Sequence, residues 1–131
     1  MIEGECFCGA IRYRIKGVLQ HARSCHCSRC RKLFGAAASA FAEITDSGQF
    51  AWTRGEDKVR RHGTDKGWAY EFCQDCGSPL CGLHRGKVIG VMLGCVDGDP
   101  GIELEKHIFV GSKAPWDHIG GSVPQYEEWE S

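Results

Sequence analysis

Cysteine is the residue type that most constrains this chain, because nine of its 131 residues are cysteines. An odd number of cysteines cannot pair completely into disulfides, and a disulfide framework also needs an oxidising compartment. The first ten residues, "MIEGECFCGA", lack a basic segment followed by an apolar one. We therefore expect no secretory signal and a cytoplasmic location, and metal binding becomes the leading use of the cysteines.

Seven cysteines form three groups with the spacing of metal ligands, namely Cys6 and Cys8, then Cys25, Cys27 and Cys30, then Cys73 and Cys76. A C-x-C pair on an extended strand directs both sulfurs to one side, and a C-x-x-C turn directs two sulfurs to one point. Gly77 follows the C-x-x-C turn, where a positive φ is easily accommodated. The first and third groups together supply the four sulfurs of a tetrahedral structural zinc site.

The middle group, Cys25, Cys27 and Cys30, is then left with three sulfurs. Three protein ligands and an open position are the usual arrangement of a zinc ion that performs chemistry. In a rival assignment His26, Cys81 or Cys95 closes this group, and both sites are structural. We expect His26 to point away from the sulfurs of its neighbours and to be packed or hydrogen-bonded. We place Cys81 and Cys95 in the core, since buried cysteine without a metal is common.

The hydrophobic pattern predicts a mainly β fold. In "AIRYRIKG", residues 10–17, apolar and basic residues alternate with the period of a half-buried strand. "GWAYEFC" repeats this alternation with Trp68, Tyr70 and Phe72 as its apolar side. Further strands are expected in "KVIGVMLGC" and "HIFVG", separated by glycine-containing turns such as "HRGK". A single helical turn, capped by Ser28, is expected over residues 28–34.

The length fits one domain over residues 1–131, with a core at about 2–118 and an irregular tail at about 119–131. No apolar run approaches the roughly 20 residues that span a bilayer, so we expect no membrane partner. The formal net charge is −1, and no basic tail is present. This balance makes nucleic acid an unlikely partner, although Arg60, Arg61 and His62 form a local basic cluster.

Four segments resemble the glutathione-dependent formaldehyde-activating family, which shares its domain with centromere protein V. They are "GECFCGAIRY", "CHCSRCRKLFGA", "FCQDCGSPL" and "HIFVGSKAPW", and they occur in the family's order. The resemblance implies a β-tent fold of short antiparallel strands stabilised by zinc. It also implies a structural zinc on Cys6, Cys8, Cys73 and Cys76, and a second, catalytic or labile zinc on Cys25, Cys27 and Cys30.

The activity that the resemblance implies is a carbon-sulfur lyase reaction run in reverse. Glutathione, the co-substrate, adds to formaldehyde and gives S-(hydroxymethyl)glutathione, so the expected partners are a small thiol and a small aldehyde. Arg29, Arg31 and Lys32 are the nearest candidates to meet the carboxylates of glutathione. Two alternatives stay open on the sequence: a zinc-stabilised module that binds protein or nucleic acid, and a labile-zinc or thiol redox protein without catalysis.

Overall fold

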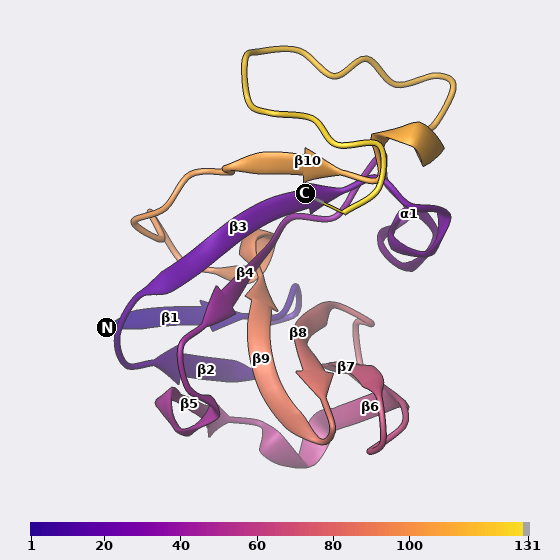
Figure 1. Ribbon diagram of the computed structural model, residues 1–131. Helices are drawn as coiled ribbons and strands as arrows, with labels where there is room; N and C mark the ends of the chain where they lie inside the picture. The colour runs from indigo at the N-terminus through magenta and orange to yellow at the C-terminus, as the bar shows by residue number, and fades with distance from the viewer. Residues whose placement is uncertain (130–131) are drawn as a thin grey trace. The chain divides into compact units, whose positions relative to one another are not determined.

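The computed structural model describes residues 1–129, which form two compact units. The first unit comprises residues 1–20 and 42–102, and the second comprises residues 21–41 and the chain from residue 103 onward. Strands dominate and only one α-helix is present among the described residues, which confirms the predicted mainly β class (Figure 1).

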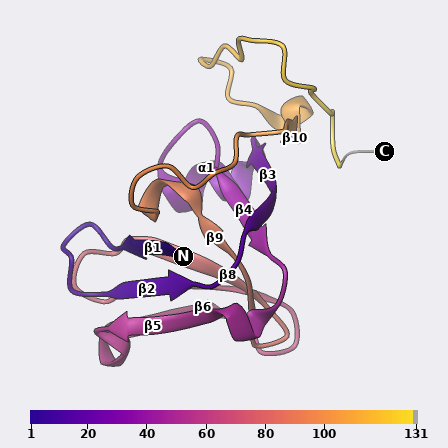
Figure 2. The same ribbon diagram turned by 90° about the vertical axis from the view of Figure 1, so that its left-hand side faces the viewer.

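A three-stranded antiparallel sheet in the first unit is built from β1 (Ile2–Glu5), β2 (Arg12–Ile15) and β5 (Phe50–Arg54), with β2 in the centre. These strands lie side by side in Figure 2. Tyr13 and Ile15 of β2 are fully buried, as the alternating pattern predicted. The ring of Tyr13 stacks on Phe50 at 5.1 Å between centroids and so anchors the core of this unit.

Four further strands of the first unit pair in antiparallel order: β6 (Val59–Gly63), β7 (Trp68–Cys73), β8 (Pro79–His84) and β9 (Lys87–Met92). β4 (Phe41–Ile44) is hydrogen-bonded to the other edge of β9. The turn between β8 and β9 consists of Arg85 and Gly86, with φ values of 52° and 78°. Two successive positive φ values are typical of a two-residue hairpin turn, so the turn predicted at "HRGK" is confirmed.

The orientation predicted for β7 was wrong. The structure buries Glu71 and Cys73 of this strand, whereas Trp68 is 61% exposed and Tyr70 and Phe72 are half-buried. The reason lies in the period of two, which places Cys73 on the side opposite Phe72. Because Cys73 is fully buried, the aromatic residues on the other side of β7 face outward.

The second unit contains residues 21–25 of β3 (Leu19–Cys25) and the helix α1 (Ser28–Phe34). Residues 23–25 of β3 pair in parallel with β10 (Lys106–Ile108). The predicted helical turn is confirmed, but its N-cap is Cys27 and not Ser28. The Cys27 Sγ atom accepts a hydrogen bond from the Cys30 N–H at 3.4 Å. Gly35 ends the helix with a φ of 58°, a conformation that favours glycine.

Short 3-10 helices complete the chain at Ser47–Gln49, Glu56–Lys58, Leu93–Cys95 and Val110–Ser112. The predicted tail is irregular but held by its backbone: the His107 N–H donates to the Pro124 carbonyl, and the Tyr126 N–H donates to the His107 carbonyl. The last two residues of the predicted tail lie outside the described part. Within residues 1–129, no helix combines the length and apolarity that crossing a membrane requires.

Candidate metal centres

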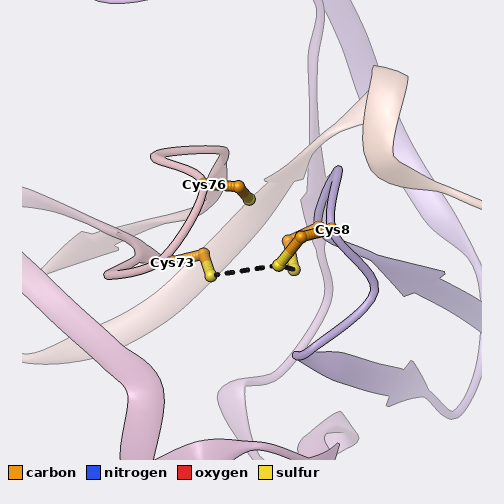
Figure 3. A group of neighbouring side chains, drawn as sticks. Cys8, Cys73 and Cys76 are labelled. Carbon is orange, nitrogen blue, oxygen red and sulfur yellow. Dashed lines mark hydrogen bonds between the residues drawn. The ribbon is translucent and has the colours of Figure 1, made fainter.

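The first candidate centre brings together the sulfurs of Cys6, Cys8, Cys73 and Cys76, all within 4.8 Å of one another. Figure 3 shows three of these side chains, Cys8, Cys73 and Cys76, which point toward one another. The Sγ atom of Cys8 lies 3.7 Å from that of Cys6 and 3.8 Å from that of Cys73. A tetrahedral zinc ion with Zn–S bonds of about 2.3 Å separates its sulfurs by about 3.8 Å. The spacing of this group therefore fits a four-coordinate zinc ion.

Two glycine-containing turns supply these four sulfurs. Cys6 and Cys8 lie in a turn after β1 and not on an extended strand as predicted, so that part of the prediction was wrong. The turn is closed by a hydrogen bond from the Gly9 N–H to the Cys6 carbonyl, and Gly9 has a φ of 78°. Gly77, with a φ of 80°, follows the C-x-x-C turn in the predicted positive-φ conformation.

Hydrogen bonds from the chain prepare the sulfurs of this centre for a charged state. The N–H of Ile11 donates to Cys6 Sγ at 3.3 Å, and the N–H of Asp75 donates to Cys73 Sγ at 3.4 Å. Burial alone would raise the pKa of Cys76, but hydrogen bonds from the side chain and backbone of Ser78 outweigh burial and lower this pKa to about 6. Cys76 thus favours thiolate, the form that binds metal. At Cys8 a backbone hydrogen bond from Ala10 lowers the pKa, but burial and the hydrogen bonds of the neighbouring sulfurs outweigh it and raise the pKa to about 11.

The second candidate centre consists of Cys25, Cys27 and Cys30, whose sulfurs also lie within 4.8 Å of one another. Cys25 ends β3, Cys27 caps α1 and Cys30 lies in the first turn of that helix. The chain thus passes from strand to helix across the centre, which directs three closely spaced sulfurs to one point. All three residues are partly exposed.

The ionisation of two sulfurs in the second centre, those of Cys25 and Cys30, is coupled. The hydrogen bond between Cys25 and Cys30 lowers the pKa of Cys30 to about 6 and raises the pKa of Cys25. Ser39 contributes a further hydrogen bond that lowers the pKa of Cys30, and the charge of Arg29 acts in the same direction. The pair therefore loses its first proton more readily, and its second less readily, than an isolated cysteine does.

His26 points away from the sulfurs, as predicted from its position between Cys25 and Cys27. It is 3% exposed, and its Nε2 atom lies 3.0 Å from Nδ1 of His107. Its own Nδ1 atom is buried without a hydrogen-bond partner among the described residues, 3.9 Å from a carboxylate oxygen of Asp117. Burial, followed by the charge of His107, lowers the pKa of His26, so the ring is neutral and connects the ligand loop to β10.

The basic residues of α1 have different environments. Arg31 is half-buried, its Nη2 atom donates to the carbonyl of Ser112 at 3.3 Å, and its Nε atom is buried without a partner in the described structure. Arg29 and Lys32 are exposed. Trp116, in the same unit, is 66% exposed.

Cys81 and Cys95 take part in neither metal-ligand group. Cys81 is fully buried, and its Sγ atom donates to Oε1 of Glu71 at 3.5 Å. The prediction that Cys95 lies in the core was wrong: it follows β9 in a 3-10 helix and is only partly buried, and its Sγ atom donates to the carbonyl of Pro79 at 3.5 Å. His26 contacts His107. Each of the three residues that could have supplied a fourth ligand to the Cys25 group therefore has a hydrogen-bond partner elsewhere.

Sequence reasoning did not identify Ser39, Ser78 or His107 as neighbours of the centres. The Ser39 Oγ atom accepts from the Cys25 N–H at 3.2 Å, and the Ser78 Oγ atom accepts from the Phe7 N–H at 2.8 Å. Only Ser78 carries a local signal, because it lies two residues after Cys76. The contacts of Ser39 and His107 depend on how the chain folds.

A family model described as glutathione-dependent formaldehyde-activating enzyme matches residues 1–112, a range that includes both candidate centres. No curated protein matches the chain.

Among solved structures, the crystal structure of a Rhodobacter sphaeroides protein, a structural genomics target, matches with a TM-score of 0.58 and 24% sequence identity. The match covers 94% of this chain and 98% of that chain, and it supports the fold alone. Because the family model spans 112 of the 131 residues, the chain belongs to the glutathione-dependent formaldehyde-activating family.

Proposed function

We propose that the protein adds a glutathione-like thiol to a small aldehyde such as formaldehyde, giving S-(hydroxymethyl)glutathione. The observation that carries this proposal is the difference between the two cysteine groups: one has four sulfurs and the other three, with partial exposure. Family membership supports a formaldehyde-activating or related thiol-adding function. We assign a structural zinc to the four-cysteine group and a second zinc to the three-cysteine group.

The reaction is an addition in which atoms and electrons balance. The thiol sulfur forms a bond to the carbonyl carbon, the carbon-oxygen π bond breaks, and the thiol proton ends on the former carbonyl oxygen. Zinc bound by Cys25, Cys27 and Cys30 would favour the thiolate form of an incoming thiol. The three thiolates would supply three of the ion's four ligands and leave one position for a reactant.

The chain's own residues orient the reactants in this proposal. The exposed Arg29 and Lys32 provide cationic groups beside the centre for the carboxylates of a glutathione-like thiol. The contact between His26 and His107 fixes the loop that carries Cys25 and Cys27. Ser39, which is 6% exposed, holds the backbone of Cys25 in place.

The experiment that tests this function measures exchange between formaldehyde, glutathione and their adduct by NMR, with the uncatalysed exchange subtracted. We expect the zinc-loaded protein to accelerate exchange and Cys30→Ser to abolish the acceleration. Cys95→Ser serves as the control, because Cys95 belongs to neither centre. Equal rates with and without the wild-type protein would overturn the proposed function and leave the metal centres as structural or storage sites.

A further inference from the structure

The outward face of β6, β7, β8 and β9 carries aromatic and basic side chains side by side. Cross-strand pairs point to the same side of a sheet. Trp68 pairs with His84, and His84 pairs with Lys87, so these three side chains share one face. Tyr70 pairs with His62, and Phe72 pairs with Arg60, on the same side. We call this set the aromatic face: Arg60, His62, Trp68, Tyr70, Phe72, His84 and Lys87.

The rings of the aromatic face contact one another across neighbouring strands and, for Tyr70 and Phe72, along β7. Trp68 and His84 lie 4.5 Å apart between ring centroids, His62 and Tyr70 5.6 Å, and Tyr70 and Phe72 5.7 Å. Trp68 is 61% exposed, and Tyr70, Phe72 and His84 are half-buried. The face therefore presents adjacent flat rings to solvent.

The hydrophobic core of the first unit is packed without these rings. The opposite side of the same strands carries Glu71, Cys73, Cys81, Leu83 and Val91, each of which is at most 9% exposed. That side supplies the packing and one cysteine of the four-cysteine group, Cys73. The outward rings are therefore available to a partner.

The charge on the aromatic face has a single sign. Arg60 and Lys87 are exposed, and no carboxylate pairs with either of them among residues 1–129. Arg60 is held by two hydrogen bonds from Nη1 to the carbonyls of Asp57 and Val59, which leave its charge uncompensated. The acidic residue of these strands, Glu71, lies on the opposite side and pairs with Arg61 at 3.4 Å.

From this geometry we propose that the aromatic face binds single-stranded nucleic acid. Bases stack on Trp68 and Tyr70, and phosphates contact Arg60 and Lys87. Proteins that bind single strands without sequence preference combine aromatic rings with cations that follow the backbone. The net charge of −1 argued against such a partner, but the sheet separates the charges and leaves this face cationic. The proposal rests on β6 to β9 alone and is independent of the proposed enzyme function.

Fluorescence anisotropy with a labelled oligothymidylate of about 15 nucleotides tests the proposal on the full chain. We expect binding at low salt, and Trp68→Ala should weaken it on the order of tenfold because one stacked base is lost. Trp68→Phe, which keeps a flat ring, should recover most of the affinity. The double substitution Arg60→Gln and Lys87→Gln should reduce the slope of log affinity against log salt by about 1.4, since each phosphate contact contributes about 0.7.

Matched controls separate the aromatic face from general surface effects. Trp129 is 62% exposed, packs on Phe109 in the second unit, and should tolerate replacement by alanine without loss of affinity. Lys16→Gln removes an exposed positive charge from the first unit outside the face and should leave the salt slope unchanged. Unchanged near-ultraviolet circular dichroism and zinc content verify that each variant is folded.

Three results would overturn the proposal. The first is the absence of binding at the lowest salt concentration. The second is equal affinity of wild type and Trp68→Ala, because the attraction would then be purely electrostatic. The third is a wild-type dimer, seen in analytical ultracentrifugation, that Trp68→Ala dissociates and the oligonucleotide does not, since the face would then bind a second copy of the chain.

Discussion

The Sγ atoms of Cys8 and Cys73 lie 3.8 Å apart although 65 residues separate them in the chain. One metal ion at this point would connect the turn after β1 to the end of β7. Apparent binding energies of structural zinc sites are about 10–16 kcal/mol, as large as the entire stability of a small domain. The four-cysteine group is therefore the proposed centre on which folding of the first unit depends.

Replacing Cys73 by serine should unfold the first unit. The change removes a ligand that is fully buried and leaves three sulfurs for a site that needs four. Thermal unfolding followed by circular dichroism should show no cooperative transition. Cys95→Ser is the matched control in the same unit and should shift the transition only slightly, and an intact transition in Cys73→Ser would show that this centre does not stabilise the fold.

The ion pair between Arg61 and Glu71 should contribute measurably to stability. Glu71 is only 9% exposed, and its Oε2 atom lies 3.4 Å from Nη2 of Arg61. Arg61→Met would leave this carboxylate nearly buried without its cation and should lower the free energy of unfolding by about 1–3 kcal/mol. Urea denaturation measures the loss. Adding Glu71→Gln to that variant should restore part of the stability, and a loss that the second change does not reduce would contradict the pairing.

Cys95 should remain protonated and slow to alkylate well above neutral pH. Burial, with the nearby charges of Cys6 and Cys76, raises its pKa from the usual 9.0 to about 11. Because the folded pKa is the higher one, the stabilisation is fully present below about pH 9 and is lost as the pH rises through about 11. Wild-type stability should therefore fall in this window more steeply than that of Cys95→Ser. Equal slopes in the two proteins, or rapid alkylation of folded Cys95 at neutral pH, would refute the assignment.

The metal-ligand groups were predictable because their signal is local. Spacings of one and two residues between cysteines place sulfurs close together in almost any compact turn, so the grouping held although Cys6 and Cys8 lie in a turn and not on a strand. The prediction of a helix over Ser28–Phe34 was also confirmed, but its N-cap is Cys27 and not Ser28 as predicted.

The hydrophobic pattern did not predict which side of β7 is buried. Trp68, Tyr70 and Phe72 form the apolar side of this strand, but Cys73 lies on the other side and is buried with the four-cysteine group. Because neighbouring residues of a strand point to opposite faces, only one of the two sides can face the core. The contact of His26 with His107 was also beyond local reasoning, because 81 residues separate the two rings.

We propose different roles for the two cysteine groups, and Cys27→Ser separates these roles in one variant. The measurement is zinc per chain by elemental analysis, combined with thermal unfolding and the glutathione-formaldehyde exchange rate on the same sample. We predict one zinc ion in the variant against two in the wild type, a cooperative unfolding transition, and loss of the catalysed exchange. Global unfolding of Cys27→Ser, or full exchange activity after loss of the second ion, would contradict the account.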